Sequence, residues 1–488
     1  MNSDIKNLEP KELWKHFADL NAVPRASKKE AKVIAFMVDF AKKLNLETTV
    51  DQVGNVIIRK PATKSMANRK PVVMQSHLDM VHQKNNDTSF DFETQGIEMY
   101  IDEDWVKAKG TTLGADNGLG VATIMAILES KTIAHPDLEA LFTVDEETGM
   151  TGAKGLRGGI LKGEILLNLD TEEDDEIGVG CAGGIDVTAL RSYQQEQVAL
   201  NSTAVEIKVR GLQGGHSGMD IHKGLANANK LMNRILFEIS KTVQIRISSI
   251  YGGGLRNAIP RESKAQVFIL NSEVSKFKDI IQIVSSDIIN EFKLIENSIN
   301  IDYHLNHFEV QGVLPLDVQN QLLQAIYAAH NGVYKMSTVI PDLVETSNNL
   351  ARVIVENGNI EIACLTRSSV ESSKKDVVNH LKSCFNLMNS EVKLSGDYPG
   401  WTPNKDSEIL KVLVAQYEKL NQGKQPRVAA CHAGLECGIL GQNYPKMDMI
   451  SFGPNIKGAH SPDERVQISS VQKYWEFVIE ILKQIPSA

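Results

Sequence analysis

Seven histidine and acidic side chains in this sequence follow apolar runs or lie in glycine-bearing loops. They are His77, Asp79, Asp116, Glu146, Glu147, Asp170 and His460. Open α/β sheets bind their ligands at the carboxyl ends of their strands, so these side chains are predicted to meet at one edge of a sheet. Imidazole nitrogens combined with carboxylate oxygens suit zinc, manganese or cobalt better than calcium. The sequence therefore predicts a cation site.

The number of candidate ligands indicates more than one cation. A single Asp or His at a strand end is most often a solvated loop residue, but the joint arrangement is much harder to obtain by chance. One tetrahedral zinc ion needs fewer ligands than this set offers. Two cations that share Asp116 would use them all.

The elements around these residues alternate between strands and helices. Helices are predicted within residues 10–21 and 27–45, the second with Ser27 as its N-cap. Strands are predicted on both sides of Gly54, and further strands end near Val144 and Asp170. We interpret this repetition as a layered α/β domain whose loops gather on one edge.

The pattern changes in the middle of the chain. Residues 187–398 contain period-two strands separated by helices, and we interpret them as an inserted α+β lid domain, with two tandem β-α-β units as one possible arrangement. Residues 1–186 and 399–488 are predicted to be the two parts of one catalytic domain.

Composition excludes several classes of protein. The 488 residues exceed the usual size of one domain. The net charge of −9 and the absence of a long basic run argue against a nucleic-acid partner. The amino terminus has no apolar signal-peptide core, and no window reaches the roughly 18 apolar residues of a membrane span. Five cysteines without a C-x-x-C pair favour reduced thiols, so we expect a cytoplasmic protein without a membrane partner.

Several motifs resemble those of the di-zinc exopeptidases, the family that includes carnosinases, tripeptidase T and aminoacylase. The motifs are SHLDMV, GTTLGADNG, DEETGMTGA, NLDTEE, GLQGGHSGMDIH and GAHSPDE, and they span almost the whole chain. The resemblance implies two divalent metal ions per chain, zinc by preference with cobalt or manganese as alternatives. It also implies that the chain is an active peptide hydrolase.

The resemblance assigns a role to each residue of the site. It implies that His77, Asp116, Glu147, Asp170 and His460 are the metal ligands, without settling which metal each one binds. Asp116 would bridge the metals and form a cis peptide bond with Asn117. Asp79 would orient the ring of His77. Glu146 would be the general base that takes a proton from the metal-activated water.

Further residues are predicted to contact the substrate. The glycine-rich stretch around His216 predicts a tight, exposed turn, and the resemblance implies that His216 stabilises the tetrahedral intermediate. Asn257 and Arg367 resemble substrate contacts, and Arg367 could bind an α-carboxylate through two hydrogen bonds. Gly434 is predicted to approach the substrate backbone. Whether His432 or Glu436 lines the pocket stays open at this stage.

The predicted function is metal-dependent hydrolysis of dipeptides, with Xaa-His (carnosine-like) substrates favoured and a monomer or homodimer as the assembly. One alternative is an N-acyl-amino-acid deacylase or a broader aminopeptidase on the same scaffold. Another alternative is a non-catalytic peptide or metal binder, which would have no need for a general base such as Glu146.

Overall fold

The computed structural model describes residues 4–306 and 312–488. The chain divides into two compact units. The first unit comprises Met1–Gly180, Trp401–Ala430 and Leu435–Ala488, and the second comprises Cys181–Gly400 and Cys431–Gly434. Compared with the predicted insertion of 187–398, the second unit begins earlier, ends later and adds the short segment from Cys431 to Gly434.

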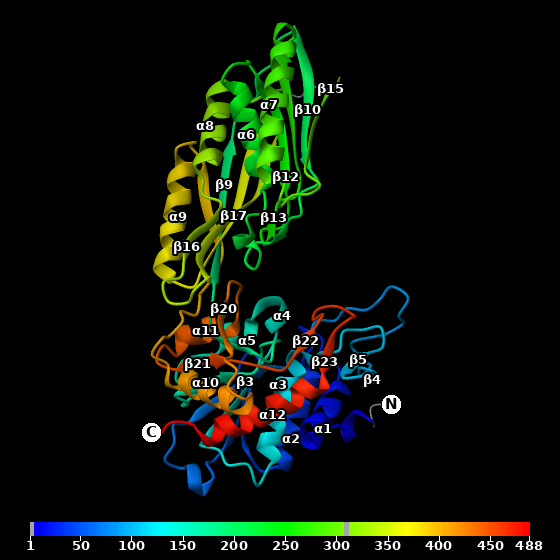
Figure 1. The fold of residues 1–488 in the computed structure, drawn as a ribbon, viewed down its shortest axis with the longest axis vertical. Helices are drawn as coiled ribbons and strands as arrows, with labels where there is room; N and C mark the ends of the chain where they lie inside the picture. The colour runs from blue at the N-terminus through cyan, green and yellow to red at the C-terminus, as the bar shows by residue number, and fades with distance from the viewer. Residues whose placement is uncertain (1–3, 307–311) are drawn as a thin grey trace. The chain divides into compact units, whose positions relative to one another are not determined.

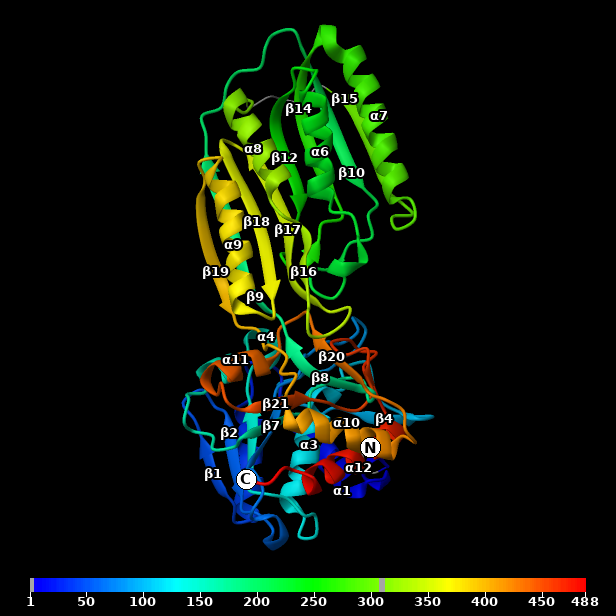
Figure 2. The same cartoon turned by 60° about the vertical axis from the view of Figure 1, so that its left-hand side comes forward.

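An eight-stranded sheet forms the centre of the first unit, in the order β1-β2-β6-β3-β7-β21-β8-β20 (Figures 1 and 2). Its strands are β1 Glu47–Val50, β2 Val56–Lys60, β3 Val72–His77, β6 Leu138–Thr143, β7 Ile165–Asn168, β8 Glu176–Cys181, β20 Arg427–Cys431 and β21 Asp448–Ser451. The central strands β6, β3, β7 and β21 run parallel to one another. Every residue of β3, β6 and β7 is buried, as expected for parallel strands covered on both faces.

Helices pack on this sheet and on one another. They are α1 Lys11–Asn21, α2 Ala31–Lys43, α3 Ala115–Glu129, α10 Glu408–Leu420, α11 Glu436–Asn443 and α12 Ile468–Lys483. Helix α3 packs against β3 and is covered by α1. It is apolar and buried almost all round, which is typical of an internal helix. By contrast, α1 and α12 are amphipathic and bury one face only.

A second, four-stranded sheet in the first unit holds two loops that matter for the site. Its order is β22-β23-β5-β4. The strands are β4 Met99–Asp102, β5 Trp105–Ala108, β22 Ile456–Lys457 and β23 Arg465–Gln467. One loop leaves β5 and leads into α3, and the other joins β22 to β23 and carries His460. Because β5 pairs with β23, the end of the strand before one loop lies beside the start of the strand after the other.

The main element of the second unit is a nine-stranded antiparallel sheet with helices on one face (Figures 1 and 2). The strand order is β15-β10-β14-β12-β17-β18-β9-β19, with β16 paired to β17. The strands are β9 Gly183–Ser192, β10 Ser202–Arg210, β12 Arg246–Gly253, β14 Ser263–Leu270, β15 Asn300–Asn306, β16 Gly332–Met336, β17 Val344–Glu356, β18 Asn359–Ser368 and β19 Glu391–Tyr398, and the helices are α6 Ala228–Ser240, α7 Val274–Phe292, α8 Leu316–Ala328 and α9 Glu371–Asn386. Pairing of β12 with β17 joins the strands from β15 to β12 and the strands from β17 to β19 into a single sheet, which packs on one apolar core.

Two further observations bear on the sequence predictions. The N-cap prediction for Ser27 is wrong: α2 begins at Ala31 after Glu30, and the Ser27 hydroxyl donates a hydrogen bond to Asp79 instead. The five cysteines form no disulfide bond in the described residues. None of the helices in that part of the chain combines the length and apolar character needed to cross a membrane.

Candidate active site

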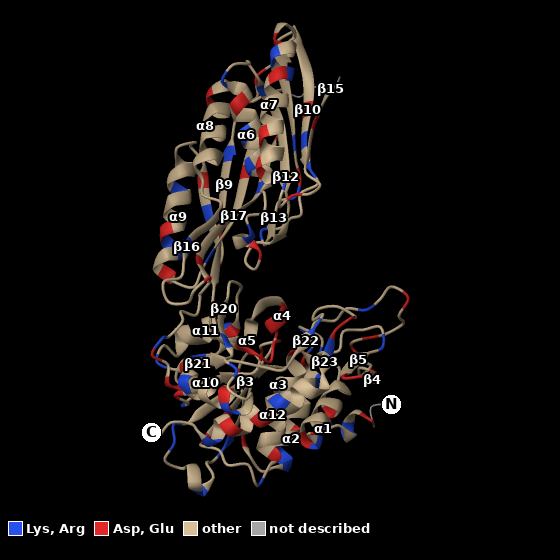
Figure 3. Cartoon of the chain, in the orientation of Figure 1, with Lys and Arg blue, Asp and Glu red and all other residues tan. Residues whose placement is uncertain are grey.

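Parallel strands bring the predicted site residues to one edge of the central sheet. His77 is the last residue of β3 and pairs in register with Thr143, the last residue of β6. Glu146 and Glu147 follow β6 in the short helix α4 (Glu146–Gly149), which Figure 3 shows to carry acidic residues. Asp170 lies just beyond the end of β7, the strand that pairs with the other side of β3. The shared strand direction therefore determines where these side chains meet.

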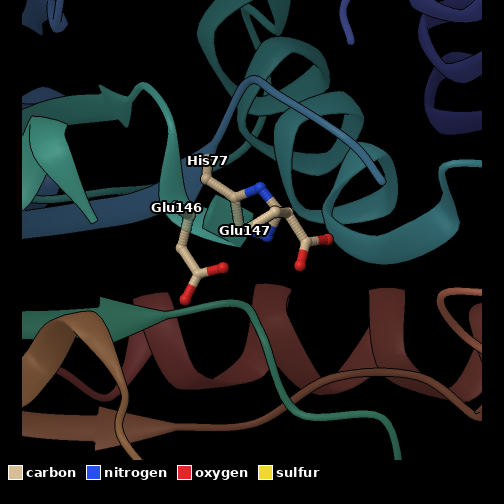
Figure 4. A group of neighbouring side chains, drawn as sticks. All are labelled: His77, Glu146 and Glu147. Atoms are coloured by element: carbon tan, nitrogen blue, oxygen red, sulfur yellow. The ribbon is translucent and has the colours of Figure 1, made fainter. Parts of the chain in front are cut away.

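His77 lies at the centre of the cluster and is buried. Its Nε2 atom is 3.0 Å from Asp116 Oδ1 and 3.5 Å from Asp170 Oδ1. Figure 4 shows the imidazole of His77 together with the side chains of Glu146 and Glu147. Burial lowers the pKa of His77, but the neighbouring carboxylates, Asp170 first among them, outweigh it and raise the pKa well above its ordinary value.

Asp116 lies between the two histidines of the site. Its Oδ1 atom faces His77, and its Oδ2 atom is 3.3 Å from His460 Nε2. The peptide bond from Asp116 to Asn117 is cis, as the resemblance implied. Burial raises the pKa of Asp116, but hydrogen bonds from both imidazoles more than offset this effect and lower the pKa. Asp116 can therefore offer one oxygen to each of two positions.

Glu147 completes the far side of the cluster with His460. Glu147 Oε2 is 3.1 Å from His460 Nε2, whereas Glu147 Oε1 is buried without a hydrogen-bond partner. Hydrogen bonds to Asp116 and Glu147 raise the pKa of His460 to about 11. The two carboxylates therefore favour positive charge at this position.

The five predicted ligands form two sets of three that share Asp116, and His77, Glu146 and Glu147 form another set of close donor atoms at the same site. One set is His77, Asp116 and Asp170, and the other is Asp116, Glu147 and His460; within each set the atoms lie within 4.8 Å of one another. Each set contains one imidazole and two carboxylates, a combination that zinc accepts. The donor chemistry and the unpartnered oxygen of Glu147 both fit a pair of divalent cations.

Asp79 supports the cluster from inside the fold. It is fully buried, and its Oδ1 atom lies 3.4 Å from His77 Nδ1. Its carboxylate also accepts hydrogen bonds from the Ser27 hydroxyl at 2.8 Å and from the backbone N–H groups of Glu146 and Glu147 at 3.0 and 3.3 Å. Asp79 thus orients both the His77 ring and the backbone that carries the two glutamates.

The environment of Glu146 favours proton transfer. Burial raises the pKa of Glu146 well above its ordinary value, and the charge of His77 opposes this effect. The neighbouring carboxylates of Asp170 and Glu436 raise the pKa further. Groups that transfer protons in active sites often have a pKa shifted in this direction.

The structure decides the position of Glu436, which the sequence left open. Its side chain is buried in the first unit at the start of α11. Glu436 Oε2 accepts hydrogen bonds from Gln75 Nε2 at 2.6 Å and Thr143 Oγ1 at 2.7 Å, and burial raises the pKa of Glu436 to about 7. The one sequence signal for this contact was the polar Gln75 inside an apolar strand.

The other predicted residues, His216, Asn257, Arg367 and Gly434, belong to the second unit. His216 is half-buried in β11 (Gly215–His216) rather than in an exposed turn, and it pairs with Ala258 of β13 (Ala258–Ile259). The backbone N–H of Ser217 donates to the carbonyl of Asn257 at 2.7 Å. The fold of the second unit therefore places His216 and Asn257 on adjacent short strands and loops.

Arg367 and His432 extend this group within the second unit. Arg367, 5% exposed, donates to the Tyr398 hydroxyl at 2.9 Å and to the Ser217 hydroxyl at 3.4 Å. His432 Nε2 lies 2.8 Å from the Ser347 hydroxyl, and its Nδ1 atom is buried without a partner. Burial lowers the pKa of His432 to about 3, and the charge of Arg367 adds to this effect. His432 is therefore neutral.

Comparison with known proteins agrees with this geometry. A family model described as "Peptidase family M20/M25/M40" matches residues 73–484. The chain is 43% identical to the cytosol non-specific dipeptidase of Escherichia coli over 99% of its own length and 100% of that protein. The crystal structure of aminoacylhistidine dipeptidase from Vibrio alginolyticus matches with a TM-score of 0.96 and 41% identity, over 100% of this chain and 99% of that one. These matches confirm the predicted fold class and the resemblance drawn from the motifs.

Proposed function

Because this chain belongs to the M20/M25/M40 family of peptidases, we propose that it is a metal-dependent dipeptidase that favours Xaa-His substrates. The observation that carries the proposal is the pair of ligand sets that share Asp116, with the half-buried carboxyl of Glu146 close to His77. Support for the substrate comes from the full-length relatives, whose names describe dipeptidases. The relative's name also supports a cytosolic location.

We propose two divalent cations per chain, with zinc first and cobalt or manganese as alternatives. His77 and Asp170 would hold one cation, Glu147 and His460 would hold the other, and Asp116 would contact both. When bound, the cations would supply positive charge that acidifies water and polarises a peptide carbonyl. The two sets of close donor atoms support this division of the ligands.

Glu146 would carry the proton during hydrolysis. Its carboxylate would accept a proton from the attacking water and donate it to the nitrogen of the leaving amino acid, as a general base that becomes a general acid does. Asp79 would take no part in the proton transfer. Its hydrogen bonds would keep His77 and the backbone of Glu146 in place.

The second unit would supply substrate contacts. Arg367 is buried, and its planar guanidinium suits two hydrogen bonds to the free carboxylate of a dipeptide. We propose that His216 donates to the oxygen that becomes negative during attack, and that Asn257 and Gly434 contact the substrate backbone. The role of this unit as a lid, and the choice between monomer and homodimer, stay predictions.

A substrate panel tests the proposed function. The purified chain would be incubated with Xaa-His dipeptides, other dipeptides, tripeptides and N-acyl-amino acids, each with and without a chelator. We expect cleavage of dipeptides, Xaa-His fastest, and loss of that cleavage with the chelator. Faster hydrolysis of N-acyl-amino acids would favour the deacylase alternative, faster hydrolysis of tripeptides would favour the aminopeptidase, and binding without turnover would indicate a non-catalytic protein.

A further inference from the structure

The loop that carries Asp116 has an unusual backbone. It links β5 to α3, and Gly114 at the N-cap of the helix has a φ of 70°, a left-handed conformation that favours glycine. Asp116 and Asn117, in the first turn of α3, have non-helical backbone angles. The N-cap residue is a glycine, so it has no side chain that could accept hydrogen bonds from the first N–H groups of the helix.

A carboxylate from elsewhere in the chain satisfies the backbone of this loop. Glu464 Oε2 accepts hydrogen bonds from the N–H groups of Leu113 at 2.7 Å and Gly114 at 2.9 Å. Glu464 Oε1 accepts from Ala115 at 2.7 Å and Asp116 at 3.2 Å. Four consecutive N–H groups at a helix start have no partners within the helix, and an anion is the group that such a set binds best.

Glu464 is buried and follows His460 on the loop between β22 and β23. The two loops are therefore joined twice, once through this backbone contact and once through the side chains of His460 and Asp116. Burial raises the pKa of Glu464 to about 7, although the backbone N–H donors favour its charged form.

Arg25 also contacts this loop, through a backbone carbonyl group. Its guanidinium is buried and donates to the carbonyl of Gly114. It also donates to the carbonyls of Leu78 and Asp79, each at 3.1 Å. Arg25 thereby connects the Asp116 loop to the strand end that carries His77.

We infer that Glu464 is a positioning residue for the cation site, because it holds the backbone that aims the two carboxylate oxygens of Asp116. The inference rests on the proposed metal-dependent function. It assigns Glu464 a role in cation affinity that goes beyond its contribution to folding. Residues that orient metal ligands typically change cation affinity or activity by roughly 10- to 100-fold when they are substituted.

The test compares Glu464→Gln with Glu139→Gln, a matched control. Glu139 is also buried and accepts backbone N–H bonds, from Lys162 at 2.6 Å and Gly163 at 2.9 Å, but it lies near the opposite end of β6 from Glu146. Zinc and manganese dissociation constants of the metal-free full chain would be measured by competition with a chromophoric chelator. Urea unfolding of the same samples would report stability.

We expect Glu464→Gln to weaken cation binding roughly 10-fold or more, and Glu139→Gln to lower stability without changing the dissociation constant. Glu464→Asp keeps the charge with a shorter reach and should bind cations with intermediate affinity. It also provides the measurement if Glu464→Gln does not fold. Kinetics at saturating metal should show KM for the dipeptide close to that of the wild type.

Three results would overturn the inference. If the Glu464 variants bind cations as tightly as the wild type, Glu464 only stabilises the fold. If neither variant folds, Glu464 is required for folding and the inferred role in cation binding is rejected. If the wild type itself binds no cation, both the proposed metal dependence and this inference are wrong. If the wild type binds cations tightly and the variants bind them equally tightly, only this inference is refuted.

Discussion

Neighbouring glutamates with different predicted roles provide the sharpest test of the mechanism. Glu147 Oε2 lies 3.1 Å from His460 Nε2, in the set of ligands that includes Asp116. Glu146 lies at the same strand end, but we assign it the proton transfer and not a metal. Replacing each by glutamine keeps its size and removes its charge, so the two variants should fail in different ways.

The expected magnitudes follow from these roles. Glu146→Gln deletes the proton acceptor, and a positioned general base contributes about 10²–10⁴-fold in rate, or about 2.7–5.4 kcal/mol in activation free energy. Metal content and dipeptide affinity should be unchanged. Glu147→Gln leaves Asp116 as the sole carboxylate in its set of three donors, so one cation should be lost or bound more weakly. Its activity should then recover in part when cation is added in excess.

The assay measures metal content, dipeptide affinity and kcat on the same preparations. Glu93→Gln, at an exposed glutamate with a side chain 62% exposed, serves as the control and should match the wild type. Glu146→Gln with wild-type kcat would refute the general-base assignment. Full metal content and unchanged cation affinity in Glu147→Gln would refute its assignment as a ligand.

Further predictions concern the metals, the second unit and the buried arginine. A chelator should abolish activity, and zinc, cobalt or manganese should restore it; activity in protein that elemental analysis shows to be metal-free would contradict this. His216→Ala should mainly lower kcat, because the contact of His216 with the substrate would form chiefly in the transition state. A normal kcat in this variant would indicate that His216 has only a structural role. Arg367→Ala should mainly raise KM for dipeptides, whereas substrates with an amidated C-terminus should lose little. Arg25→Met should lower the free energy of unfolding by about 3–5 kcal/mol in urea titrations, because it leaves the buried carbonyls that Arg25 contacts without a donor and removes the positive charge near the Glu464 carboxylate. A change below about 1 kcal/mol would contradict this.

Local pattern predicted the strand ends well for a physical reason. β3, β6 and β7 are short apolar runs that end in polar residues, and each run is buried as the pattern indicates. The side chains of His77, Glu147 and Asp170 meet because parallel neighbours end at the same edge. The N-cap prediction for Ser27 was wrong because a hydroxyl forms whichever hydrogen bond the fold offers, and here a buried carboxylate is within reach.

The sequence by itself determined the residue types of the site, their places after apolar strands and, through the motifs, the family of the chain. Only the tertiary structure decided which donor atoms form a set, because distances between loops far apart in the chain depend on how the sheet and helices pack. It showed Asp116 between His77 and His460, and it separated Glu436 of the first unit from His432 of the second. It also showed that Glu464 caps the start of α3, although Glu464 and Asp116 are 348 residues apart in the chain. No local pattern reports such a contact, since a carboxylate and a helix start become partners only when folding brings them together.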